Sequence, residues 1–374
     1  MPTLQDYHRA VTATDRRPAV DALKIAVFGL FGETGSILSE IKKHAREGDA
    51  YRSFGSVLVE ELGDLLWYYA ALASSLGVSL DTLFARALGL AIGPTTTFDE
   101  IDVVLSNEAS RTTLVGDPWM RAAAAIGNLT ALAATPEKDN LLKPAIEALR
   151  TLVTAAHGLR LRLSEAADAN LAKVSGRWPK DQVLRPLYDD DPSVPVDERL
   201  LRNYAVDFQE ITVRGKKYVV QKVFTLKIGD PLTDNITESD DYRFHDVFHF
   251  AYSAVLGWSP VLRSLFKVKR KSDPDKDENE DGARAILIEE GIASWVFSRA
   301  KEIDYFDGVQ RVDYSIIKTI ADFVRGYEVE DQPFWAWERA ILQGYDVFRE
   351  LKARRKGRVQ VNLLDREIRF EPIA

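Results

Sequence analysis

The chain has 374 residues, of which 46% are hydrophobic and 28% are charged, a balance typical of globular rather than disordered proteins. This length exceeds what one ordinary hydrophobic core holds, so we expect two or more domains. The net charge of −8 argues against nonspecific coating of nucleic acid as the main role, and we expect no sequence-specific nucleic-acid partner.

The chain contains no cysteine, which excludes disulfides, thiolate zinc sites and a cysteine nucleophile. Its first residues, MPTLQDYHRAVTATDRRPAV, lack a basic segment followed by an apolar one, so we expect no signal peptide. No window approaches about 18 uninterrupted apolar residues, so we expect no membrane-spanning helix. Together these features predict a cytoplasmic protein with no membrane partner.

Helical periodicity dominates the first half and predicts an all-α helical bundle as the N-terminal domain, residues 1–185. Two long helices are expected at 21–45 and 57–76, and Gly77 ends the second because glycine readily adopts positive φ. Ser79 can cap a helix that runs to about Leu90. After a loop at 93–100 that restarts a helix, further helices are expected at 118–134, 140–158 and 163–175.

The composition changes at residues 186–200, PLYDDDPSVPVDERL, which are rich in proline and acids and are predicted to form a linker. Residues 201–374 predict an α+β domain of unknown role. Two strands are expected within 206–224 around the turn Arg214-Gly215-Lys216-Lys217, and a terminal hairpin within 358–372. Helices are expected at 239–256, 282–302, 313–326 and 334–355.

Acids of the first two long helices fall where they can converge. Glu33 and Glu40, seven residues apart, occupy about the same face of one helix, and Glu61 and Asp64 share a face of the next. If the helices pack antiparallel, carboxylates brought together in one cleft repel unless they are protonated or bind cations. Such hard oxygen ligands suit Mg²⁺, with Mn²⁺ as an alternative, and can support hydrolysis of a nucleotide phosphoanhydride. The other interpretation is that these acids simply face solvent.

The sequence around these acids resembles a known family. The blocks GLFGETGSILSEIKK (29–43), EELGDLLWYYAALASSLGVSLDTL (60–83) and NLAKVSGRWP (170–179) are similar to the MazG-like branch of the all-α nucleoside triphosphate pyrophosphohydrolases. The resemblance covers residues 20–90 and 163–180. It implies a Mg²⁺-dependent hydrolase that cleaves a nucleoside triphosphate between the α and β phosphates, giving a monophosphate and pyrophosphate.

In that family a helix carrying E-x-x-E precedes one carrying E-x-x-D. Glu33 matches the first acid, and Glu61 and Asp64 match the second pair, so the resemblance implies that these three are catalytic residues and metal ligands. The remaining acid falls at Ser36, which is neutral and a poor Mg²⁺ ligand. One metal ligand is therefore absent, or is supplied by Glu40 one turn further along the helix.

Asn170, Lys173 and Arg177 match an Asn-Lys-Arg segment of the family, and the resemblance implies that they and Lys43 bind substrate. The amide can read a base or ribose edge, and the cations can hold phosphate oxygens. In the family this segment follows the acidic helices closely. Here a long helical stretch intervenes, either as an insertion or as the second half of a pseudo-dimeric helical repeat. The resemblance also implies a homo-oligomer, a dimer, whose site combines helices of two subunits.

A histidine pair marks the second half of the chain. His245 and His249 lie four residues apart on one helix face, and with Glu289 or Glu290 they can ligate a transition metal. The spacing resembles the H-E-x-x-H pattern of zinc proteases, with Asp246 as a shorter acid. An HD-type phosphohydrolase and a buried structural pair are the other interpretations.

The sequence thus predicts a hydrolase: a Mg²⁺-dependent nucleoside triphosphate pyrophosphohydrolase whose C-terminal half has an unassigned role. The alternative is a non-catalytic nucleotide-sensing or oligomerisation scaffold. In that case any activity would reside in the C-terminal domain, at His245, His249 and Glu290.

Overall fold

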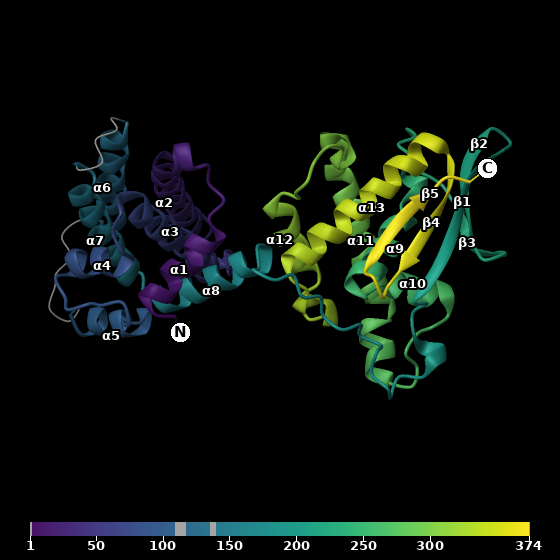
Figure 1. Ribbon diagram of the computed structural model, residues 1–374, viewed down its shortest axis with the longest axis horizontal. Helices are drawn as coiled ribbons and strands as arrows, with labels where there is room; N and C mark the ends of the chain where they lie inside the picture. The colour runs from purple at the N-terminus through teal and green to yellow at the C-terminus, as the bar shows by residue number, and fades with distance from the viewer. Residues whose placement is uncertain (1, 109–116, 135–139, 374) are drawn as a thin grey trace. The chain divides into compact units, whose positions relative to one another are not determined.

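The computed structural model describes residues 2–108, 117–134 and 140–373 (Figure 1). Contacts divide the chain into two compact units, Met1–Lys180 and Asp181–Ala374. The described part of the first unit consists of α-helices and short 3₁₀ turns, with an isolated β-bridge between Thr3 and Thr97. The second unit combines a five-stranded sheet with helices. The predicted fold class, an all-α half followed by an α+β half, is therefore confirmed.

The helices of the first unit agree closely with the predicted ranges where the apolar periodicity is long. Gly77 ends α3 in the left-handed conformation, as expected, and Ser79 caps α4. The described helices are α1 (Leu4–Thr14), α2 (Ala22–Glu47), α3 (Phe54–Leu76), α4 (Leu80–Leu88), α5 (Phe98–Glu108), α6 (Pro118–Ala133), α7 (Leu142–Gly158) and α8 (Leu163–Arg177).

Helix α1 has no counterpart among the predicted elements. Its N-terminus is capped by Thr3, whose hydroxyl oxygen accepts a hydrogen bond from the backbone N–H of Asp6 at 3.0 Å. Leu4, Tyr7 and Val11 form its buried stripe. Three apolar positions in a short, otherwise polar segment are a weak periodic signal, and packing against α3 and α8 secures the helix.

Helix α3 lies at the centre of the first unit and packs against α1, α2 and α8. Its leucine face is buried, and Gly63 on it meets α8 at very short range. A methyl group at Gly63 would lie 2.6 Å from the carbonyl oxygen of Ala166 and 3.0 Å from Cβ of Asn170. The missing side chain at this one position therefore sets how closely α8 approaches α3.

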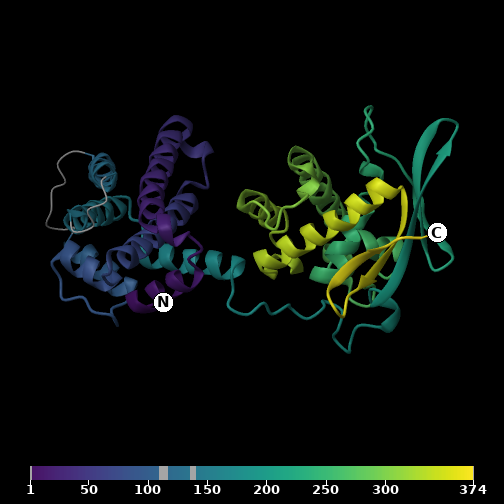
Figure 2. The same ribbon diagram turned by 45° about the horizontal axis from the view of Figure 1, so that its top comes forward.

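The second unit is built on an antiparallel sheet with strand order β3-β2-β1-β4-β5. Central strand β1 alternates buried and partly exposed residues, which is typical of a sheet covered on one face. Figure 2 shows the helices gathered on one side of the sheet, where α9 and α13 contact β4 and β5. The strands are β1 (Asn203–Val213), β2 (Lys216–Val223), β3 (Leu226–Leu232), β4 (Lys356–Asn362) and β5 (Glu367–Glu371).

The two predicted hairpins, β1-β2 and β4-β5, are present, whereas edge strand β3 and helix α10 are additional to the prediction. The helix expected at 239–256 begins only at Asp246, after a 3₁₀ turn at Tyr242–Phe244. Helix α9 is buried from Val247 to Leu256. The α-helices of this unit are α9 (Asp246–Leu256), α10 (Pro260–Phe266), α11 (Ala283–Ala300), α12 (Tyr314–Phe323) and α13 (Phe334–Arg354).

The segment 186–200, expected as a linker, packs against the second unit. The carboxylate of Asp189 is fully buried, and its Oδ2 lies 2.8 Å from Nη2 of Arg263. Arg202 approaches Oδ1 of the same carboxylate at 2.7 Å. Leu187 and Leu200 belong to the hydrophobic core of the second unit.

One helix in the described part of the chain, spanning Ala19–Ala50, is long and apolar enough to cross a membrane. The bent pair α3 and α4 would add a second span if the two crossed together. Core helices of globular proteins pass the same test, so the finding is weak evidence. The absence of a membrane partner and the cytoplasmic location remain predictions.

We expect Gly63→Ala to destabilise the protein by about 1–3 kcal/mol, because the added methyl group must push α8 away from α3. The measurement is the free energy of unfolding from chemical denaturation. Gly32→Ala is the matched control, since it adds a methyl group in the interior of α2 that would meet no other part of the described structure within 4 Å, apart from the adjacent turns of its own helix. That variant should gain roughly 0.5–1 kcal/mol. Equal effects of the two substitutions would contradict the proposed close approach.

Candidate active site

The acids predicted from the sequence come together at the interface of α2 and α3. The side chains of Glu33 on α2 and Glu61 on α3 adjoin within hydrogen-bond reach, a contact that is favourable when one of the two carboxyl groups is protonated. Burial, together with the neighbouring Glu33, raises the pKa of Glu61 to about 8. Burial also raises the pKa of Glu33. The cluster thus has more negative charge than its surroundings neutralise.

Helix α8 supplies polar partners to this cluster. Nζ of Lys173 lies 2.5 Å from Oδ2 of Asp64 and 3.4 Å from Oε1 of Glu60. The amide nitrogen of Asn170 donates to the other oxygen of Asp64 at 2.9 Å. Burial nevertheless raises the pKa of Asp64, since it outweighs the opposing effects of Lys173 and Asn170. Acids from α2 and α3 therefore meet a cation and an amide from α8.

Tyr7 of α1 fixes the orientation of the Asn170 amide, through a contact that was not predicted from the sequence. Its hydroxyl group donates to the amide oxygen of Asn170 at 2.9 Å, in a fully buried position. Because that oxygen accepts from Tyr7, the amide nitrogen of Asn170 must face Asp64. A tyrosine 163 positions away in sequence leaves no local signal, so only the folded structure reveals this contact.

The other site residues predicted in the first half make contacts with different partners. Glu40 accepts a short hydrogen bond from the hydroxyl group of Tyr51 and lies 3.8 Å from Lys43. The Lys43 ammonium group also stands over the ring of Tyr51, 4.0 Å from its centroid. The Arg177 guanidinium stacks on the ring of Trp178 at 4.8 Å. Ser36 is half-buried on α2, one turn after Glu33.

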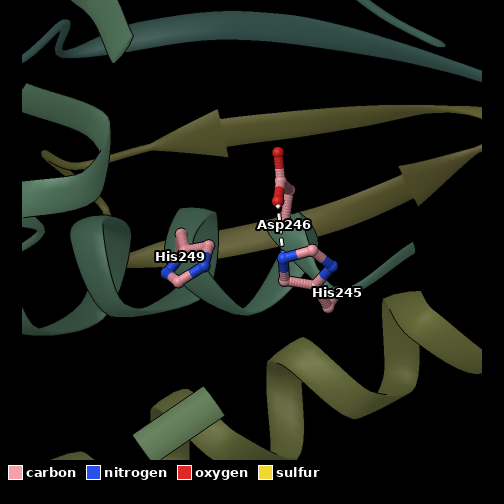
Figure 3. A group of neighbouring side chains, drawn as sticks. All are labelled: His245, Asp246 and His249. Atoms are coloured by element: carbon pink, nitrogen blue, oxygen red, sulfur yellow. Dashed lines mark ion pairs between the residues drawn. The ribbon is translucent and has the colours of Figure 1, made fainter. Parts of the chain in front are cut away.

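The histidine pair of the second half lies at the start of α9. Figure 3 shows His249 on this helix and His245 just before its first residue, with Asp246 paired to His245. Nε2 of His245 lies 3.1 Å from Oδ1 of Asp246. Among the described residues, His245, Asp246 and His249 are the one group that places three candidate ligand atoms within 4.8 Å of one another. The acids that the structure describes in the first unit form no such group.

Two glutamates of α11 adjoin the histidines. The fully buried carboxylate of Glu289 lies 2.8 Å from Nδ1 of His249. The half-buried Glu290 lies 3.6 Å from Nε2 of the same ring and 3.8 Å from Nε2 of His245. Although burial opposes it, His249 lowers the pKa of Glu290 to about 2. From the sequence, Glu289 and Glu290 were alternative partners of the histidine pair. In the structure both lie beside the histidines.

The two clusters fit different cations. Oxygen donors alone, as offered by Glu33, Glu61 and Asp64, suit Mg²⁺ or Mn²⁺, and burial raises the pKa of all three carboxyl groups. Imidazole nitrogens combined with carboxylates, as in the second unit, suit transition metals such as Zn²⁺.

Comparison with known proteins gives a family for the second unit. A family model described as the MazG C-terminal domain matches residues 185–374. The sequence motifs placed the resemblance in the N-terminal half, whereas this match lies in the C-terminal half, for which the sequence suggested no family.

A curated relative, the "Gene 37 protein" of Mycobacterium phage L5, is 38% identical over 72 residues. The aligned region is 19% of this chain and 63% of the phage protein, so the chain spans less than two thirds of that relative. No solved structure matches the chain.

The raised pKa of Glu61 predicts a loss of stability with rising pH in metal-free buffer. The folded protein keeps this proton up to about pH 8, whereas the unfolded chain releases it near the ordinary value of 4.5. Stability therefore falls as pH rises from 4.5 to 8 and stays reduced above that range. Glu61→Gln removes this titrating group. The free energy of unfolding of the variant, relative to that of the unaltered protein, should therefore increase as the pH rises from 4.5 to 8.

The measurement is the free energy of unfolding at several pH values with a chelator present. Glu165→Gln is the control, because this exposed acid lies on the surface of α8. A constant difference between Glu61→Gln and the unaltered protein from acid to alkaline pH would contradict the prediction.

Proposed function

The chain belongs to the MazG C-terminal domain family, and on this premise we propose that its helical unit is a nucleoside triphosphate pyrophosphohydrolase. The proposed reaction cleaves the bond between the α and β phosphates and yields a nucleoside monophosphate and pyrophosphate. One observation carries the proposal: the hydrogen-bonded pair Glu33–Glu61 beside Asp64, with Lys173 opposite. The motifs that resemble the MazG-like enzymes contain these same residues.

In this proposal Glu33, Glu61 and Asp64 hold Mg²⁺, with Mn²⁺ as a substitute. The bound cation would neutralise charge on the phosphates and favour attack by water. Glu40 is left out of the ligand set, because its described contacts are with Tyr51 and Lys43. Ser36 therefore remains without an acidic replacement, and the ligand set is one carboxylate smaller than in the family pattern.

The residues of α8 have two roles in the proposed reaction. Lys173 neutralises Asp64 when no divalent cation is bound, and we expect it to turn toward substrate phosphates when one is. Asn170 binds Asp64 and Tyr7 through both ends of its amide group, so it acts as a positioning residue rather than as a reader of the base. One acid of the cluster would orient the attacking water by accepting its proton.

A homo-oligomer, which the family resemblance implies, remains part of the proposal. Two phenylalanines of α2, Phe28 and Phe31, are more than half exposed, at 56% and 54%. Exposed aromatic side chains on one helix are consistent with an interface between copies of the chain.

A second candidate function is nucleotide sensing without hydrolysis. Two observations favour it: the neutral Ser36 at an expected ligand position, and the contact of Lys173 with Asp64, which satisfies this acid without a metal. A sensor would bind a triphosphate with Mg²⁺ and release no pyrophosphate.

We expect Glu61→Gln and Asp64→Asn to reduce pyrophosphate release by about 100-fold or more, because several kcal/mol of charge stabilisation is lost. The assay screens nucleoside triphosphates with Mg²⁺ and identifies the products by mass. Glu165→Gln should retain the full rate, and circular dichroism should show that all variants remain helical.

Unchanged turnover in both acidic-cluster variants would refute the assignment. Tight binding of a triphosphate by the unaltered protein, with no pyrophosphate from any nucleotide, would favour the sensor instead.

A further inference from the structure

The cluster at the start of α9 is built like a metal centre. We propose that His245, Asp246, His249 and Glu290 bind a transition metal ion of the Zn²⁺ class in the second unit. This site is independent of the carboxylate cluster of the first unit, and its ligands come from α9, from the residue preceding it and from α11.

The surroundings of His245 determine which nitrogen can bind a metal. Its Nδ1 lies 2.9 Å from the backbone oxygen of Tyr242, which can only accept, so Nδ1 carries the proton and donates it. Nε2 then presents a lone pair to Oδ1 of Asp246 at 3.1 Å, a contact between two acceptors that a cation between them would make favourable. The ring of Tyr242 stacks on the imidazole at 4.2 Å and limits its rotation. The ring is therefore fixed in the tautomer that a metal requires.

His249 is fixed in the same way from a different side. Its Nδ1 lies 2.8 Å from Oε1 of Glu289, whose two oxygens also accept from the hydroxyl group of Ser259 and the backbone N–H of Val261. A buried carboxylate behind a ligating histidine is the usual outer partner in metal sites. Nε2 of His249 is fully buried, and its neighbour Glu290 lies 3.6 Å away, beyond ordinary hydrogen-bond distance, within the described part of the chain. A metal ion between this nitrogen and Glu290 would bind both at closer range than they approach each other here.

The two acids complete the donor set. One oxygen of Asp246 accepts from the side-chain amide of Gln221 at 2.5 Å, which leaves the other oxygen toward His245. Glu290 directs one oxygen toward both imidazoles, and its side chain is 40% exposed, whereas His249 is fully buried. The metal ion, and any water bound to it, is therefore expected to enter and leave on the side of Glu290. Two imidazoles with carboxylates favour Zn²⁺, Co²⁺ or Fe²⁺ over Mg²⁺.

The test uses the full-length chain and Co²⁺ alone as a spectroscopic probe, with Zn²⁺ as a competitor. All variants are made in the Glu61→Gln background, so that the carboxylate cluster of the first unit contributes little binding. We expect one tightly held equivalent of Co²⁺ with visible absorption, displaced by Zn²⁺. His245→Gln and Glu290→Gln should each weaken this binding at least ~10-fold, and Glu289→Gln should weaken it by ~10–100-fold.

His157→Gln is the matched control, since it removes an imidazole from α7 of the first unit and should leave the absorption unchanged. Thermal unfolding verifies that each variant is folded, and Glu290→Gln is the safest variant because its side chain is partly exposed. Absence of tight Co²⁺ or Zn²⁺ binding would overturn the proposal. So would binding that persists in both His245→Gln and Glu290→Gln, because the ion would then lie elsewhere.

Discussion

Two carboxyl groups on neighbouring helices, Glu33 of α2 and Glu61 of α3, are held in contact in a half-buried position. This proximity is unfavourable unless a proton or a cation lies between them. It persists because the packing of α2 on α3 is secured by buried leucines such as Leu30, Leu62 and Leu65. The helical unit therefore gives up stability at one point, which is typical of groups retained for binding rather than for folding.

Helix α8 makes this arrangement tolerable. Its approach to α3 depends on the missing side chain of Gly63, and the approach brings Lys173 and Asn170 to Asp64. Tyr7 then fixes the direction of the amide. Four helices thus contribute to one small polar cluster, and a change in the distance between α3 and α8 alters charge neutralisation as well as packing.

The long helices and both hairpins could be predicted because many residues contribute to each periodic pattern. The short elements α1 and α10 offer too few apolar positions, and edge strand β3 contains Gly229 and Pro231, which usually argue against a strand. The acids of the candidate site were found from spacing and resemblance. The contacts of Tyr7 with Asn170 and of Glu40 with Tyr51 depend on tertiary packing, so no local pattern could reveal them.

Asp189 is buried in the second unit, so a fragment of this unit must include Asp189 to fold with its native contacts. The Asp189 carboxylate is the nearer of two buried acids beside the almost fully buried Arg263, the other being Asp281 at 3.5 Å. A fragment starting at residue 201 would remove this hydrogen-bonded carboxylate and the backbone oxygen of Glu198, which also accepts from Arg263, and would leave the more distant Asp281 beside the guanidinium, at a cost of about 1–3 kcal/mol. The proline-rich stretch therefore belongs to the C-terminal body, and truncation upstream of residue 185 would preserve it, in agreement with the start of the family match.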